Sequence, residues 1–158
     1  MHTLLLLRHA KSDWPNNVQD IDRPLTERGI KDLATVSQRL KEHNYRPDRL
    51  ITSNALRATT TAKSFAKTLE VNLHVEPHLY NMETKDALAY IRSTDENVKN
   101  LMLVGHNPTW EFLVKYFTGE YITMPTCTLV EIRFTTTWEE VAQESGKIIY
   151  FDYPKRAL

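Results

Sequence analysis

The chain has 158 residues, of which 41% are hydrophobic and 25% are charged, as is typical of a single globular domain that buries its own core. Twenty basic and twenty acidic residues cancel, so no overall field would draw the protein to nucleic acid or to an anionic membrane. One cysteine excludes an intramolecular disulfide, and no stretch approaches the roughly 20 apolar residues of a membrane helix. We expect a single domain over residues 1–158, located in the cytoplasm.

The N-terminal segment predicts a buried strand followed by a helix. Residues 3–7 form a continuous apolar run that ends abruptly in Arg8 and His9, as in a central parallel strand that delivers polar residues to a site. Thr26 is a suitable cap for a helix that ends near residues 43–45. The expected apolar face of this helix contains Ile30, Leu33, Ala34, Val36 and Leu40.

The rest of the chain alternates between expected strands and expected helices. Strands are expected over residues 49–52, 71–75, 100–104, 126–134 and 147–151, and helices over residues 55–69, 85–92 and 108–116. The last two strands form a hairpin or join the edge of the sheet. The alternation predicts a three-layer α/β/α sandwich with a mostly parallel central sheet.

Polar residues follow three of these strands where each strand ends. Arg8 and His9 follow the first, residues 53–57 the second, and residues 105–107 the strand at 100–104. Ligands of open parallel sheets bind outside the carboxyl ends of the strands, so two histidines and two arginines could meet there. Arginine binds phosphate oxygens two at a time and stays charged at any relevant pH. Each residue alone is more often structural, but the group together indicates a phosphoryl site.

Four sequence blocks resemble one known family. They are residues 4–12, which read LLLLRHAKS, residues 23–29, which read RPLTERG, residues 53–62, which read SNALRATTTA, and residues 104–108, which read VGHNP. In this order they resemble the histidine phosphatase superfamily, which includes phosphoglycerate mutases, and within it the SixA-like phosphohistidine phosphatases. The resemblance implies a phosphoglycerate mutase-like fold.

The resemblance also implies roles for individual residues. His9 would accept the phosphoryl group covalently, and Arg8, Arg57 and His106 would hold that group, with His106 joining the arginines if it is protonated. No metal or cofactor is then expected. Two further candidates for binding phosphate are Ser12 and Asn107, although Ser12 could equally satisfy a loop backbone and Asn107 could cap the following helix.

Departures from the commoner pattern of the superfamily bear on the substrate. Many members of the superfamily have glycine and glutamate at the positions of Ala10 and Lys11. The alanine and lysine pair resembles the SixA-like branch. Many members carry a glutamate as general acid after the third strand, whereas this chain reads PHLYN over residues 77–81. An imidazole leaving group needs less proton donation than an alkoxide does, so we expect phosphohistidine on a protein, a phosphotransfer or phosphocarrier domain, as the substrate. Glu76, Glu83 and Asp22 stay open as proton donors.

Three alternative functions differ from this one in substrate, turnover or nucleophile. A small-molecule phosphomonoesterase or mutase would use the same fold on a phosphorylated metabolite. A phosphate-binding or phosphohistidine-sensing module would have lost turnover, against which the complete set of pocket residues argues. Cys127 and Arg133 have the spacing of cysteine-dependent phosphatases, but the residues between them alternate as a strand and contain no glycine for a phosphate loop.

Overall fold

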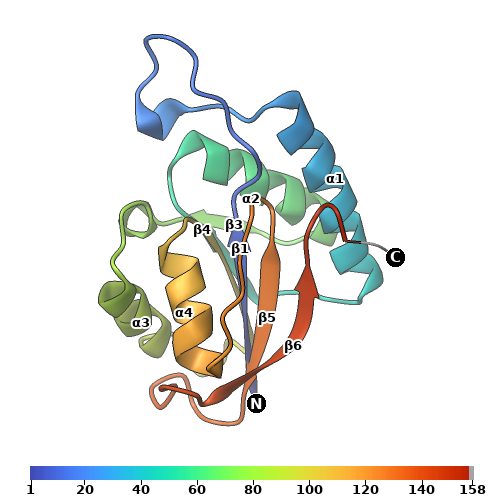
Figure 1. The fold of residues 1–158 in the computed structure, drawn as a ribbon. Helices are drawn as coiled ribbons and strands as arrows, with labels where there is room; N and C mark the ends of the chain where they lie inside the picture. Colours follow the sequence, from blue (N-terminus) through green and yellow to red (C-terminus); the bar gives the residue numbers. More distant parts are fainter. Residues whose placement is uncertain (157–158) are drawn as a thin grey trace.

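A six-stranded sheet forms the centre of the computed structural model, which describes residues 1–156 (Figure 1). The strands lie in the order β3-β2-β4-β1-β5-β6. Their bounds are β1 (His2–Arg8), β2 (Arg49–Thr52), β3 (Leu73–Val75), β4 (Asn100–Gly105), β5 (Leu129–Phe134) and β6 (Gly146–Asp152). The first four strands are parallel, and β5 and β6 add to the β1 edge antiparallel to their neighbours. The mostly parallel sheet predicted from the sequence is confirmed.

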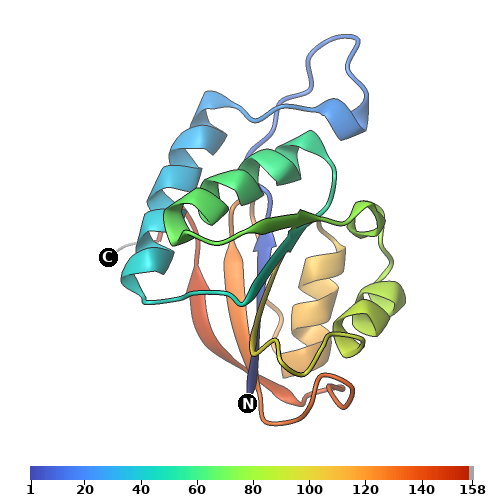
Figure 2. The same cartoon turned by 180° about the vertical axis from the view of Figure 1, so that it is seen from behind.

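Four helices cover the two faces of the sheet, so the three-layer prediction is also confirmed. They are α1 (Glu27–Glu42), α2 (Leu56–Leu69), α3 (Thr84–Arg92) and α4 (Thr109–Thr118). Helices α3 and α4 lie in front of the sheet in Figure 1, and α1 and α2 in front of it in Figure 2. Strand β1 contributes side chains to the hydrophobic core on each face of the sheet. Leu5 and Leu7 pack with α1 and α2, whereas Leu4 and Leu6 pack on the opposite side. None of the helices within residues 1–156 is long and apolar enough to cross a membrane.

Two details of the prediction are wrong. Ile30 and Ala34 are exposed rather than buried, because α1 turns Gly29 toward the sheet, where its lack of a side chain lets it pack directly on the backbone of Lys11. The fifth strand starts at Leu129 rather than at residue 126, because the chain first makes a turn in which Cys127 has a φ of 62°. The alternating pattern of residues 126–134 hid that turn.

Strand pairing brings the carboxyl ends of β1, β2 and β4 to one edge. Arg8 pairs with Gly105, and the backbone N–H of His9 donates to the Gly105 carbonyl at 3.1 Å. Trp110 of α4 secures this arrangement, because its indole Nε1 donates to the Leu7 carbonyl at 2.9 Å and its ring lies against Gly105. A Cβ atom at position 105 would lie 2.6 Å from that ring, so the close packing requires glycine.

Candidate active site

A cavity of about 300 Å³ lies at this edge of the sheet and contains every site residue predicted from the sequence. We call it the phosphate cavity. Its lining residues are Arg8, His9, Lys11, Ser12, Arg23, Arg57, His106, Asn107 and Thr126. Parts of the chain as far apart as residues 8 and 126 therefore meet around one small polar space.

His9 has the protonation and tautomer of a nucleophile. Its Nδ1 lies 2.7 Å from the carbonyl oxygen of Ala10 and donates a proton to it, which leaves the lone pair on Nε2. Burial lowers the pKa of His9 to about 3, and the positive charges of Arg57 and Arg8 act in the same direction. The imidazole is therefore neutral near pH 7.

His106 faces His9 across the cavity. The two ring centroids lie 5.2 Å apart, and His106 Nε2 forms a hydrogen bond of 2.7 Å with Ser53 Oγ. Burial lowers the pKa of His106 to about 4, and Arg57 also lowers it. His106 is thus neutral near pH 7 in this structure, and the protonated form considered from the sequence would require a nearby anion to raise its pKa.

The two arginines line the cavity, and each donates hydrogen bonds to a neighbouring segment. Arg8 donates from Nη1 to the Met124 carbonyl at 3.0 Å, and Arg57 donates from Nη1 and Nη2 to Asp20. The Nε–H group of each arginine is buried without a hydrogen-bond partner in residues 1–156. Guanidinium groups bind oxyanions through charge-assisted hydrogen bonds, and both arginines line the cavity.

Ser12 and Asn107 differ in what their side chains can offer. Ser12 Oγ accepts a hydrogen bond of 2.9 Å from Arg23 and keeps its own proton to donate. Asn107 Nδ2 already donates to Glu111 at 3.1 Å and to the Met124 carbonyl at 2.9 Å. The Asn107 side chain therefore anchors the loop before β5, and a contact with phosphate would have to come from its backbone N–H group.

The sequence did not predict three residues that line the phosphate cavity, nor one carboxylate that binds two of its arginines from outside the lining. Lys11, Arg23 and Thr126 line the phosphate cavity, and Asp20 holds Arg23 and Arg57 from outside it. Arg23 stands in one of the blocks that carried the resemblance and could have been singled out as a third arginine. No pattern in the polar loop marks Asp20.

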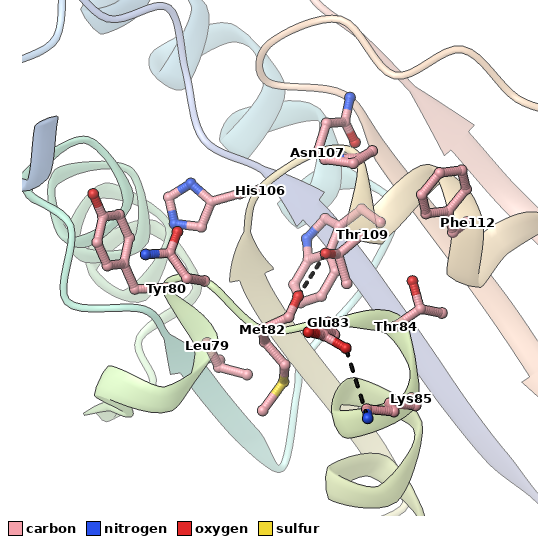
Figure 3. Close-up of a pocket in the computed structure, with 13 residues that line it drawn as sticks. Leu79, Tyr80, Met82, Glu83, Thr84, Lys85, His106, Asn107, Thr109 and Phe112 are labelled. Carbon is pink, nitrogen blue, oxygen red and sulfur yellow. Dashed lines mark hydrogen bonds and ion pairs between the residues drawn. The ribbon is translucent and has the colours of Figure 1, made fainter.

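A groove of about 610 Å³ adjoins the phosphate cavity and shares His106 and Asn107 with it (Figure 3). Four apolar side chains in its lining are Leu79, Met82, Trp110 and Phe112. In Figure 3, Tyr80 and His106 lie at one end of this groove and Glu83 and Lys85 at the other.

Among the three carboxylic acids considered as proton donors, only Glu83 lines either space. No carboxyl group is among the described residues that line the phosphate cavity. Glu76 and Asp22 line neither space, and the Glu76 carboxylate bonds to the exposed His78. Within residues 1–156, the cavity around His9 therefore provides guanidinium, imidazole, ammonium, amide and hydroxyl groups, but no carboxylic acid.

The cysteine-phosphatase alternative does not fit the structure. Cys127 lies in the turn before β5, whereas Arg133 lies near the far end of that strand, exposed opposite Thr3 of β1. The Cys127 thiol is buried, and burial raises its pKa well above the usual range. A reactive cysteine needs the reverse shift.

A neutral imidazole and two arginines therefore lie together at the carboxyl edge of this sheet. The chain belongs to the histidine phosphatase superfamily (branch 1), whose family model matches residues 4–87. It has the phosphoglycerate mutase-like fold of that superfamily, and its enzymatic class is that of a phosphatase.

Three relatives extend the comparison. An uncharacterized chloroplastic protein of Arabidopsis thaliana is 33% identical, with 90% of this chain and 72% of that protein aligned. The crystal structure of a candidate SixA phosphohistidine phosphatase from Agrobacterium tumefaciens is 28% identical and superposes with a TM-score of 0.84 over 97% of this chain and 98% of its own. The protein histidine phosphatase SixA complexed with tungstate superposes with a TM-score of 0.81 at 22% identity, over 96% and 97% of the two chains.

Proposed function

We propose that this protein hydrolyses phosphohistidine on another protein through a covalent phosphohistidine at His9. One observation carries the proposal: a neutral His9 with its lone pair on Nε2 lines one small cavity together with Arg8 and Arg57. The first group is a nucleophile, and the other two are donors for the oxygens of a phosphoryl group.

The first chemical step would transfer the phosphoryl group to His9. Nε2 of His9 attacks phosphorus as the P–N bond to the substrate imidazole breaks, and that imidazole leaves with a proton from solvent or from its own protonated form. Arg8 and Arg57 hold the equatorial oxygens as charge redistributes. The carbonyl of Ala10 keeps the proton on Nδ1 and so stabilises the imidazolium-like phosphohistidine.

The second step would return the enzyme to its starting state. A water molecule attacks phosphorus from the side opposite His9, the P–Nε2 bond breaks, and inorganic phosphate leaves with the proton balance restored by solvent. The ring of His106 lies 5.2 Å from that of His9 and lines the same cavity. Once a phosphoryl dianion raises its pKa, protonated His106 can donate a hydrogen bond to the transferred group.

The lining of the cavity supports a nitrogen leaving group. An alkoxide leaving from a phosphate ester needs a proton in the transition state, and the described lining of the phosphate cavity offers no carboxylic acid to supply it. An imidazole needs much less assistance. The likeness to SixA phosphatases, one of them bound to the tetrahedral oxyanion tungstate, agrees with this assignment.

The groove beside the cavity supports a macromolecular substrate. It opens from His106 toward the exposed Phe112 and Glu83, so a histidine side chain could reach His9 while the surface that carries it rests along the groove (Figure 3). The proposed partner is a phosphotransfer or phosphocarrier domain in the cytoplasm. A chain whose only cysteine is a buried free thiol fits that compartment.

Turnover of matched substrates tests the proposal. Phosphohistidine peptide, phosphohistidine protein, phosphoserine and 3-phosphoglycerate would be compared at equal concentration, with His9→Ala as the blank. We expect kcat/KM for the phosphohistidine substrates to exceed that for the esters by at least 100-fold. Equal rates on the esters would refute the substrate assignment. Acid-labile phosphate trapped on the wild type and absent from His9→Ala would separate an enzyme from a phosphate-binding module.

One observation favours a second candidate, a small-molecule phosphomonoesterase. Glu83 lines the groove that would hold the leaving group, and its carboxyl group could donate a proton to an alkoxide. In that case phosphate esters would be turned over efficiently, and Glu83→Gln would abolish that activity while leaving phosphoramidate hydrolysis intact.

A further inference from the structure

The carboxylate of Asp20 binds two arginines of the phosphate cavity at once. Its Oδ1 accepts from Arg23 Nη1 at 3.2 Å, and its Oδ2 accepts from Arg57 Nη2 at 3.1 Å. Its backbone carbonyl also accepts from Arg57 Nη1 at 2.7 Å. Asp20 itself does not line the cavity, whereas both arginines do. A single residue outside the cavity lining therefore binds two of the arginines that line the cavity.

Tyr80 ties the same carboxylate to a third segment of the chain. Its hydroxyl donates to Asp20 Oδ2, and its ring lies 5.9 Å from the Arg57 guanidinium carbon and 5.7 Å from the His106 ring. Partial burial alone would raise the pKa of Asp20, but hydrogen bonds from Tyr80, Arg57 and Arg23 outweigh that effect and lower the pKa to about 2. Asp20 is thus ionised at any working pH and cannot serve as a proton donor.

These contacts restrict how Arg57 faces the cavity. A guanidinium carries five N–H groups in one plane, and Asp20 takes one from each terminal nitrogen of Arg57. Asp20 leaves one hydrogen on each terminal nitrogen of Arg57 unused, and Arg57 itself lines the cavity. The negative charge also offsets repulsion among Arg8, Arg23 and Arg57, which would otherwise push these side chains apart.

We infer that Asp20 is the positioning residue of the phosphate cavity: it orients Arg57 and Arg23 toward the phosphoryl oxygens without lining the cavity itself. The inference rests on the proposed phosphoryl transfer at His9, but it does not depend on which group leaves. The contrary possibility is that Asp20 competes with phosphate for Arg57. The two possibilities predict opposite changes in phosphate affinity when the carboxylate is removed.

The test compares Asp20→Asn with Asp22→Asn. Asp22 is an exposed carboxylate in the same 3-10 turn, η1 (Asp20–Asp22), and lines neither the cavity nor the groove. Phosphoramidate serves as a small substrate and inorganic phosphate as a competitive inhibitor, so that neither assay depends on a protein substrate. Assays run well below the melting temperature of each variant.

We expect Asp20→Asn to lower kcat/KM by roughly 10- to 100-fold, as small misplacements of a positioning group do, and to weaken inhibition by phosphate about tenfold. Asp22→Asn should stay within twofold of the wild type. Asp20→Glu, which keeps the charge, should recover part of the loss. Tighter phosphate inhibition in Asp20→Asn, or unchanged kinetics, would overturn the inference.

A double-mutant cycle separates positioning from general structural support. If Asp20 acts through Arg57, then Asp20→Asn should cost at least fivefold less in kcat/KM in an Arg57→Ala background than in the wild type. If the two losses multiply, Asp20 acts independently of Arg57 and the inference is wrong. Failure of the proposed substrate would look different, because it would leave this coupling on phosphoramidate intact.

Discussion

The rings of His9 and His106 face each other across the phosphate cavity, with their centroids 5.2 Å apart and their planes at 51°. Both imidazoles are largely buried beside Arg8 and Arg57. Protonation of either ring would place a positive charge beside two guanidinium groups, so the neutral form is favoured for both rings. In the proposed function the two guanidinium groups would attract a phosphoryl dianion, whose negative charge would raise the pKa of His106.

The first prediction concerns the protonation of these two rings. Proton NMR of the imidazole C–H signals, assigned with His9→Ala and His106→Ala, should show both residues neutral at pH 7, with titration midpoints below pH 5 because burial lowers each pKa. Saturating tungstate or phosphate should move the His106 midpoint upward. A midpoint of either ring near 6.5 in the free protein would contradict this description of the cavity.

A second prediction follows for stability at acid pH. The folded pKa values are about 3 for His9 and about 4 for His106, whereas an unfolded histidine titrates near 6.5. Between these values the unfolded state binds more protons, so the free energy of unfolding falls as pH decreases from about 6.5 toward 4. Each group contributes at most about 1.4 kcal/mol per pH unit. Urea unfolding of His9→Ala/His106→Ala should show a shallower decline over this range, and a decline as steep as that of the wild type would count against it.

A third prediction tests the assignment of Cys127 to the core. Replacing this buried thiol by serine should leave kcat within twofold of the wild type, because its side chain lies outside the phosphate cavity. Burying the hydroxyl should lower the free energy of unfolding by about 1–3 kcal/mol. Steady-state kinetics and urea unfolding measure the two effects. Loss of kcat in a folded Cys127→Ser variant would reopen the cysteine mechanism.

A fourth prediction concerns the contact between Gly105 and Trp110. The methyl group of Gly105→Ala would lie 2.6 Å from the Trp110 ring, so we expect a loss of about 1–3 kcal/mol in stability from overpacking. Because His106 follows directly, kcat should also fall at least tenfold. Adding Trp110→Leu should recover part of the kcat, since it removes the clashing ring. Wild-type stability and kcat in Gly105→Ala would show that the contact does not position His106.

The fifth prediction concerns Glu83 at the far end of the groove. If the substrate is a phosphoramidate, Glu83→Gln should change kcat for a phosphohistidine peptide by less than threefold, because an imidazole leaves without a strong general acid. Rates between pH 5 and 8 give the measurement, and Glu76→Gln provides a matched control that lines neither space. A large loss confined to Glu83→Gln would identify it as the proton donor.

The central strands could be predicted because burial on both faces leaves a plain signal. The run Leu4–Leu7 has no exposed surface, and neither do Leu101, Met102 and Val104, so each appears in the sequence as an unbroken apolar segment. The turn at Cys127 left no such signal, since its left-handed backbone interrupts a stretch whose alternation looks continuous. The exposure of Ile30 was equally hidden, because it depends on Gly29 meeting Lys11, a contact between distant segments.

The residues of the site also fall into those that the sequence predicts and those that it does not. His9, Arg8, Arg57 and His106 could be placed because they follow predicted strands within recognisable blocks, and the structure brings all four to one cavity. Asp20 could not be placed, because its partners Arg57 and Tyr80 are 37 and 60 residues away and its own loop has no periodicity. Contacts of this kind depend on tertiary structure alone.

The loop that follows His9 is closed at its base by the pairing of Ser12 with Leu25 and by a hydrogen bond of 2.8 Å from Asp13 N to the Pro24 carbonyl. This loop projects beyond the sheet in Figure 1, and it touches the catalytic edge chiefly through Asp20 and Arg23. Asp13 and Trp14 hold Arg23, through the Asp13 carbonyl and the Trp14 ring, so residues 15–19 are the part of the loop that can change in length and chemistry during divergence. Exchanging this one loop could therefore change the substrate preference while His9 and its neighbours on the sheet stay the same.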